Sequence, residues 1–350
     1  MLLGGLAIAW MSSQVDPQRA AGAMTVANRT SAAFEQPAAG LSVAELKRHG
    51  EADLLFDRTH VPLATRPGAG LGPQFVAPSC VACHVRNGRG RPVPDEALVR
   101  VVLKGGLGPQ VQDKAVLGAE PEAEVRVDWL QARNQDPDLR QPNVGLRLSN
   151  GQHLDRSLAR SFRVAPPLLG LGLLEAVPAS TITALADPED ADGDGISGRA
   201  SWVSDPTGQR RLGRFGWKAI SASVRDQSAD AYQQDMGLTT PINPDSDLAA
   251  DGHPADISNR ELNLVTYYSQ TLGAPRTALG SRSPVVRQGM HLFRELHCAS
   301  CHVPSLRTAA TADAVVKALR DQTIWPYSDL LLHDMGPGLD DGVAEGSAAS

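Results

Sequence analysis

The sequence predicts a mainly α-helical, loop-rich protein that carries short β-hairpin insertions. Apolar residues recur at helical spacing over residues 285–296 and 259–272, which predicts two amphipathic helices. Glycine and proline account for 33 and 25 of the 350 residues, above average usage, so we expect many loops. Residues 100–160 hold short valine and leucine runs broken by glycine and proline, which predict brief strands or hairpins.

Start signals place the other helices. Ser42 and Glu45 have the spacing of a capping box and predict a short helix that ends near His49. Ser258 and Glu261 repeat this spacing, and the helix that they open is predicted to end before Gly273.

The helix predicted over residues 285–296 has one distinctive face. Gly289 and Phe293 are four residues apart and therefore lie on the same side, where the small residue admits a close helix contact. A loop-rich stretch at 274–284 precedes this helix, and we place a domain boundary there.

The composition indicates a folded protein and excludes two classes, nucleic-acid binders and membrane-spanning proteins. An apolar content of 42% is enough to form a core. The net charge of −6 argues against a nucleic-acid binder, which needs a basic face. No stretch reaches the roughly 18 apolar residues of a membrane span, so we expect no transmembrane segment in the mature chain.

The first 40 residues are predicted to be a leader followed by an unstructured segment. The apolar run from Leu2 to Met11 is similar to the core of a secretory signal, although it lacks a preceding basic region. The small residues Ala21–Ala23 form a candidate cleavage site.

All four cysteines belong to two copies of one motif. They read Cys80-Val81-Ala82-Cys83-His84 and Cys298-Ala299-Ser300-Cys301-His302. C-x-x-C-H is the attachment motif of c-type haem. Two thiols one helical turn apart can bond to the two vinyl groups of a porphyrin, and the adjacent histidine then supplies an axial nitrogen to the iron. The sequence therefore predicts two covalent haems, with His84 and His302 as axial ligands.

Three other interpretations compete. C-x-x-C can be a redox dithiol, two Cys–His sets can contribute to a zinc site, or the motif can be accidental. Two copies that use every cysteine in a long chain favour haem. Because haem c is attached outside the bacterial inner membrane, this assignment predicts a periplasmic protein.

The two motifs divide the chain into two cytochrome-c-like haem domains. We expect the first over residues 41–275 and the second, incomplete at its C-terminal end, over 276–350. The Gly289–Phe293 spacing before the second motif resembles the N-terminal helix of a class I cytochrome c.

Each iron needs a sixth ligand or an open position, and an open position permits peroxide chemistry. Met335, in a glycine- and proline-rich loop, is the first candidate for a distal ligand of the second haem. Met236 is the second candidate and His333 the third. The alternative for each methionine is simple packing, because methionine commonly fills gaps.

An acidic loop predicts a calcium site. Asp190, Asp192 and Asp194, followed by Gly195, match the first half of an EF-hand loop. Position 12 of that loop is Ser201 instead of glutamate, so the loop is either a weak or shared calcium site or a solvated acidic turn.

Three further features have a functional and a structural interpretation. Glu175 ends an apolar block and is the candidate catalytic acid or base, or a structural cap. Arg89 and Arg91 could contact a haem propionate or lie in a solvated loop. Trp217 could lie between the haems or simply pack.

Longer motifs resemble one family. They are Gly70–Pro73, Asp190–Gly198, Leu212–Ala219, Asp235–Thr239 and Pro326–Gly336. Together they look like the bacterial di-haem oxidoreductase family, over roughly residues 50–345. The resemblance implies a periplasmic two-haem protein, distantly similar to bacterial di-haem cytochrome c peroxidases, with an iron-related role. The family normally continues with a Trp-Arg-Thr-Pro-Pro-Leu-Trp-Gly segment and a further helical region, so this chain reads as a C-terminally truncated form.

Three functions follow as hypotheses. The first is a peroxidase-like oxidoreductase, in which one haem accepts electrons from a partner protein and the other, with an open position, reduces peroxide. The second is a non-catalytic electron-transfer cytochrome linked to iron uptake, with both irons fully ligated. The third, a thiol oxidoreductase, needs free C-x-x-C pairs, and the histidine after each pair argues against it.

Overall fold

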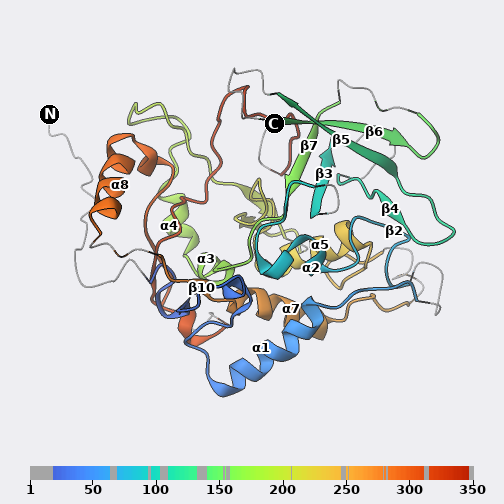
Figure 1. The fold of residues 1–350 in the computed structure, drawn as a ribbon, viewed down its shortest axis with the longest axis horizontal. Helices are drawn as coiled ribbons and strands as arrows, with labels where there is room; N and C mark the ends of the chain where they lie inside the picture. The colour runs from blue at the N-terminus through green and yellow to red at the C-terminus, as the bar shows by residue number, and fades with distance from the viewer. Residues whose placement is uncertain are drawn as a thin grey trace.

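The structure is a computed structural model, and Figure 1 shows its ribbon. It describes residues 19–63, 69–93, 96–102, 109–131, 140–152, 154, 158–205, 207–245, 250, 252–278, 280, 283–310 and 315–346. The apolar run at 2–11 lies outside these residues. No helix of the described chain is long and apolar enough to cross a membrane.

The fold is mixed α/β and loop-rich, so the prediction of a mainly α-helical protein of two cytochrome-c-like domains is wrong. The described residues form seven α-helices, with 29% of residues helical and 19% in strands. The strands pair as six separate two-stranded units. The helical content is low because several helices are single turns between glycine- and proline-rich loops.

The largest β unit is longer than the brief hairpins predicted from the sequence. Strands β5 (Ala123–Gln131) and β6 (Arg140–Leu148) pair antiparallel over nine residues each. Burial alternates over the first five residues of β5, as expected for a half-buried strand with a side-chain period of two, and the last four residues are exposed. Its inner face packs on β3 (Ala97–Val101) and β7 (Arg160–Val164), around Val99, Val101, Val144 and Leu146.

Three helices form the helical part of the core. α1 (Val43–Phe56) and α5 (Val224–Met236) both pack on α7 (Asn259–Thr271). Both predicted capping boxes, at Ser42 and Ser258, are confirmed. α1 continues well beyond His49 because Ala52 and Phe56 extend its buried face against α7. α7 is buried along most of its length.

The segments before residue 41 and after residue 305 meet in one cluster. β1 (Thr25–Val26) pairs parallel with β10 (Ala274–Pro275). Met24 is completely buried beside Leu319 and Ile324. The candidate cleavage site Ala21–Ala23 leads into this cluster, so the residues around it contribute to the core.

Shorter elements connect these parts. They are η1 (Gly22–Met24), η2 (Ala33–Glu35), β2 (Gln74–Phe75), α2 (Cys80–Cys83), η3 (Val85–Asn87), β4 (Lys114–Ala115), α3 (Leu171–Glu175), α4 (Ala179–Thr183), β8 (Trp202–Ser204), β9 (Arg210–Leu212), α8 (Pro284–Glu295), η5 (Cys298–Ser300), β11 (Leu306–Arg307), η6 (Lys317–Leu319) and β12 (Thr323–Ile324). α8 lies toward the left edge of Figure 1.

Candidate functional site

The first C-x-x-C-H motif forms one helical turn. α2 spans Cys80–Cys83, and the His84 N–H donates to the Cys80 carbonyl at 2.9 Å. Both thiols are free, and burial raises the pKa of each to about 12, with Asp235 adding to the effect. The turn therefore presents two neutral thiols and a histidine, in the order that covalent haem attachment needs.

His84 has an unsatisfied ring nitrogen. Its Nδ1 is buried and has no hydrogen-bond partner among the described residues. Burial lowers the pKa of His84 to about 4, so the imidazole is neutral at pH 7 and able to ligate a metal. The ring lies 6.4 Å from Phe56, tilted by 57°. A buried neutral histidine with one unpaired ring nitrogen fits a residue that holds a metal or a haem.

Met236 lies close to the first motif. It is 2% exposed at the end of α5, in the apolar cluster against which Cys80 and Val81 pack. Gly237 follows with φ 66° and ends the helix. The structure therefore brings this predicted distal ligand into the first motif's surroundings.

The second motif has the same local form. The His302 N–H donates to the Cys298 carbonyl at 2.9 Å. Nδ1 of His302 lies 3.1 Å from the Tyr327 carbonyl oxygen. Because a carbonyl only accepts, Nδ1 carries the proton, and Nε2 keeps its lone pair for a metal. The ring lies 6.3 Å from Phe293, tilted by 58°.

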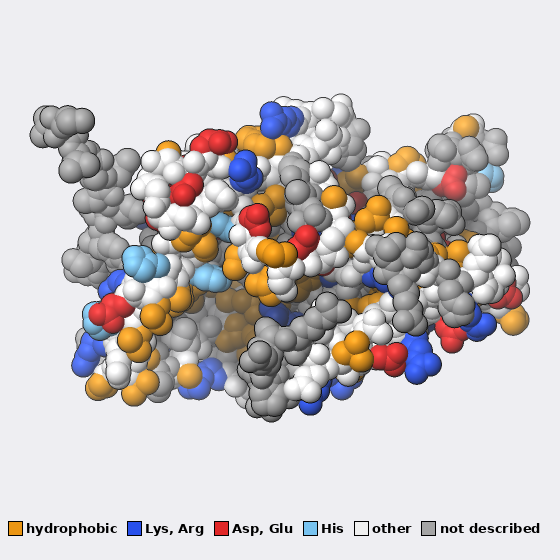
Figure 2. All heavy atoms as spheres, turned by 90° about the horizontal axis from the view of Figure 1, so that it is seen from above, with side chains coloured by type: hydrophobic (Ala, Val, Ile, Leu, Met, Phe, Trp, Pro, Cys, Tyr) orange, Lys and Arg blue, Asp and Glu red, His pale blue; other side chains and the backbone are white. Residues whose placement is uncertain are grey.

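An open hollow lies between α8 and the segment that follows His302. Its volume is about 190 Å³, and its lining is Gly289, Met290, Phe293, Arg294, Pro304 and Tyr327. α8 has no buried residue, although its apolar side chains share one face. The close helix contact expected at Gly289 is absent from the described residues, since nothing lies within 4 Å of a Cβ placed there. Apolar side chains are visible at the surface in this part of the molecule (left side of Figure 2).

His333 and Met335 are placed differently. Nδ1 of His333 lies 3.8 Å from Sγ of Cys301, and its Nε2 lies 2.6 Å from a carboxylate oxygen of Asp329. The Met335 side chain is 64% exposed. The structure therefore brings His333, but not the side chain of Met335, into contact with the second motif.

Glu175 makes structural contacts. One carboxylate oxygen accepts the Val224 N–H at the start of α5 at 2.8 Å, and the other accepts the Gln270 amide of α7. The Glu175 carbonyl also accepts from Arg214. These bonds join α3, α5 and α7, and none of them reaches a motif residue.

The arginines after the first motif have protein partners. Arg91 pairs with the buried carboxylate of Glu96, which lowers the pKa of Glu96. Arg89 lies over the Trp217 ring, 5.6 Å from its centre. Trp217 is half-exposed, and its Nε1 donates to the Val164 carbonyl at 2.9 Å.

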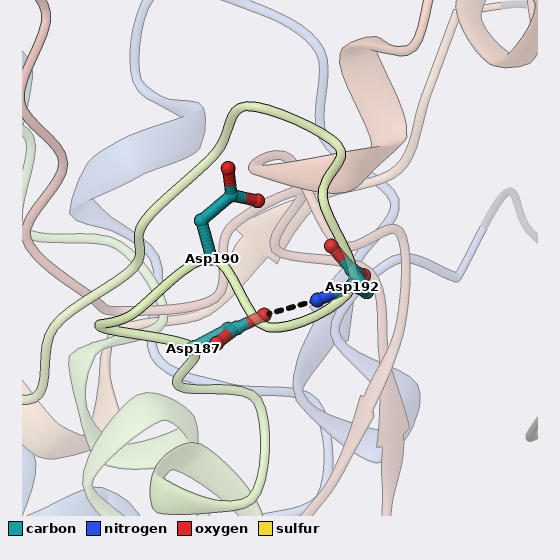
Figure 3. A group of neighbouring side chains, drawn as sticks. All are labelled: Asp187, Asp190 and Asp192. Carbon is teal, nitrogen blue, oxygen red and sulfur yellow. Dashed lines mark hydrogen bonds between the residues drawn. The ribbon is translucent and has the colours of Figure 1, made fainter.

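The acidic loop gathers three carboxylates. Oxygens of Asp187, Asp190 and Asp192 all lie within 4.8 Å of one another (Figure 3). Asp194, predicted as a ligand, instead accepts the Ile196 N–H at 2.9 Å. The EF-hand pattern missed Asp187 because this residue lies three positions before the loop begins.

Asp235, Tyr327 and Asp329 lie within the family motifs Asp235–Thr239 and Pro326–Gly336, but the sequence predicts no role for any of them. Asp235 and Tyr327 each act beside residues that are distant in the chain. Asp329 and His333 are four residues apart, a spacing that has no meaning outside a helix and is therefore no signal in an irregular segment.

Taken together, the residues at both motifs fit a covalent haem. Each offers two unbridged thiols on one turn, a neighbouring histidine with a nitrogen available, and a phenylalanine beside the ring. At the second motif, the uncovered apolar face of α8 is suited to a large apolar group.

Comparison with known proteins agrees with this donor set. The family model described as "Di-haem oxidoreductase, putative peroxidase" matches residues 14–106 and 147–349. The unmatched stretch between them contains β4, β5 and most of β6. No curated protein and no solved structure matches the chain. Because the family model covers most of the sequence, the chain belongs to the di-haem oxidoreductase family.

Proposed function

We propose that this chain is a periplasmic oxidoreductase with two covalent c-type haems, which takes electrons from a partner protein and reduces peroxide. One observation carries the proposal. In two segments far apart in sequence, the histidine of a C-x-x-C-H turn lies beside a phenylalanine with almost the same geometry. The two ring centres are 6.4 Å apart with an interplanar angle of 57° at the first motif, and 6.3 Å apart with an angle of 58° at the second.

The attachment residues follow from this placement. Cys80 and Cys83 would hold the first haem, and Cys298 and Cys301 the second. His84 and His302 would supply the axial nitrogens. When bound, the haems supply one-electron chemistry at iron, and the protein sets their ligands, burial and access to small molecules.

The different surroundings of the two sites support different roles for them, electron transfer at the first and peroxide reduction at the second. The first motif is half-buried against the core, and Met236 from the cluster that it contacts is the candidate sixth ligand. A haem whose sixth position is closed by Met236 would suit electron transfer, the main role in the alternative of a non-catalytic cytochrome. The second motif borders an open hollow, so we assign peroxide access to it. Met335 remains a predicted ligand that would have to move inward.

The acidic loop is proposed to bind calcium through Asp187, Asp190 and Asp192. Their carboxylates suit this hard cation. We expect calcium to raise the melting temperature of the wild type and to have a much smaller effect on Asp187→Asn. An identical calcium response in the two proteins would contradict the site.

Haem content is the first test. We expect periplasmically expressed protein to contain two haems per chain in a pyridine haemochrome assay. Cys80→Ala/Cys83→Ala and Cys298→Ala/Cys301→Ala should each retain one. Zero haem with four titratable thiols in the wild type would overturn the proposal and favour dithiol chemistry.

Peroxide turnover is the second test. With two haems loaded, we expect a reduced donor to be oxidised by peroxide, and Cys298→Ala/Cys301→Ala to abolish this activity. Loaded protein that exchanges electrons with a donor but does not consume peroxide would favour the electron-transfer alternative.

A further inference from the structure

The hairpin of β5 and β6 is the largest β unit of the described chain, and it has only two strands. It lies in the upper right part of Figure 1. Most of it belongs to residues 107–146, the stretch that the family model does not match. The surface that this hairpin presents therefore lies outside the part of the chain that the family model describes.

The outer edge of β6, which faces away from β5, is covered. The Val144 carbonyl accepts a hydrogen bond from the Arg160 guanidinium at 2.8 Å, and the Leu146 carbonyl accepts the Leu154 N–H at 3.1 Å. Pro142, on the same edge, has no N–H to offer. Cover and proline of this kind keep a strand edge from pairing with another chain.

The outer edge of β5 has no such cover within the described chain. Backbone groups alternate between the two edges of a strand, so the residues of β6 that face β5 are the odd-numbered ones. In the register they lie opposite even-numbered residues of β5, which leaves the backbone groups of Val125, Val127 and Trp129 facing outward. No hydrogen bond joins these groups to another described segment, and β5 contains no proline. The edge is therefore open to a further strand.

The side chains along this edge are exposed and carry both signs of charge. Arg126 and Asp128 are 80% and 48% exposed, and they point to the same face because they are two residues apart. Trp129 is 44% exposed, and its ring meets Phe162 edge-on at 5.8 Å. A strand that docked here would meet an apolar ring and two opposite charges.

We propose that β5 pairs antiparallel with β5 of a second copy of this chain, about a two-fold axis beside Val127. In this register Val127 lies opposite Val127 of the second copy, and Val125 lies opposite its Trp129. All of these positions face outward, so they form the hydrogen-bonded pairs of an antiparallel ladder. The pairs of valine and tryptophan also bring together β-branched and aromatic side chains, which stabilise a sheet across strands.

Charge favours this register over the neighbouring one. Arg126 lies opposite Asp128 of the second copy, and a two-fold axis forms this ion pair twice. An axis at Val125 would instead pair Arg126 with Glu124. It would also set Asp128 opposite Glu122, and this contact between like charges would occur twice as well. The strand is therefore complementary to itself about Val127.

Charge reversal tests the proposal. Sedimentation equilibrium of the full chain as purified, at low ionic strength, should show a reversible dimer. Arg126→Asp and Asp128→Arg should each weaken the dimer at least about tenfold, because each sets like charges opposite one another at two places. Both side chains are exposed, so far-UV circular dichroism should stay unchanged. The matched control is Arg147→Asp, an exposed reversal on β6, which should leave the dissociation constant unchanged.

An equimolar mixture of the two variants gives the sharper readout. In the mixed pair, the aspartate introduced at position 126 lies opposite the arginine introduced at position 128, and the native Asp128 lies opposite the native Arg126. The mixture should therefore dimerise with about the wild-type affinity. The double variant Arg126→Asp/Asp128→Arg should recover for the same reason.

Three outcomes would overturn the proposal. The first is a wild type that stays monomeric at the highest concentration that remains soluble. The second is a dimer that neither charge reversal weakens, which would place the contact on another surface. The third is a dimer that both reversals weaken and the mixture does not restore, which would exclude this register. None of these results depends on haem content, so they leave the proposed function to its own tests.

Discussion

The two C-x-x-C-H motifs share a local geometry but differ in their surroundings. Phe56 beside the first motif is 3% exposed and packs on Tyr268 of α7, with ring centres 5.0 Å apart. Phe293 beside the second motif belongs to α8, which has no buried residue. Its ring meets Tyr327 edge-on at 5.4 Å, next to an open hollow. Similar short motifs can therefore serve different purposes, because the surrounding chain decides burial.

The largest expected effect tests this contrast directly. Phe56→Ala should lower the free energy of unfolding by about 3–5 kcal/mol, because it leaves a cavity in the core. Phe293→Ala should cost the haem-free protein less than about 1 kcal/mol, because its ring is partly exposed already. Urea denaturation of both variants measures the difference. Equal costs would show that the second site is as well packed as the first.

The second prediction concerns the tail that links the two regions. Glu345, beyond the second motif, accepts from Arg100 at 2.7 Å and from Arg163, both near the first region's sheet. All three side chains are no more than 10% exposed. Glu345→Gln should cost about 3 kcal/mol, since it leaves two buried cations underpaired. Urea denaturation measures this, with the exposed Glu124→Gln as control. An unchanged midpoint would mean that the tail contributes nothing to holding the regions together.

The third prediction uses the buried acid at the first site. Burial raises the pKa of Asp235 to about 6, above the ordinary aspartate value. The folded protein therefore retains a proton that the unfolded chain loses, and stability should fall as pH rises from about 4 to about 6. Asp235→Asn should remove up to about 3 kcal/mol of the change in unfolding free energy over this pH range. The measurement is the free energy of unfolding against pH. A slope that survives the substitution would assign it to another group.

The smallest effect concerns helix caps. Ser258 caps α7, which covers the first site, through the Glu261 N–H at 3.2 Å. Ser283 precedes α8 and makes no side-chain cap. Ser258→Ala should therefore lower the melting temperature by the equivalent of about 1 kcal/mol, and Ser283→Ala by almost nothing. A similar loss of melting temperature in both variants would show that α8 unfolds together with the rest of the protein, despite its exposure.

Local patterns predicted local structure well. Both capping boxes and the helix before the second motif are confirmed, because these signals depend on neighbours three or four residues apart. The fold-class prediction is wrong partly because residues 100–160, predicted as brief strands or hairpins, contain a nine-residue strand pair, β5 and β6. The acidic cluster also differs from the prediction: Asp187 joins Asp190 and Asp192, whereas Asp194 accepts the Ile196 N–H.

The candidate site shows the same division. By itself the sequence determined the two C-x-x-C-H motifs and the family, because both depend on residue types and spacings along the chain. Only the tertiary structure decided that Met236 lies in the cluster beside the first motif and that His333 instead of Met335 touches the second. It also decided that the first motif is half-buried against the core, whereas the second lies beside an open hollow. Those properties depend on contacts between segments far apart in sequence, which burial and packing select and local spacing does not encode.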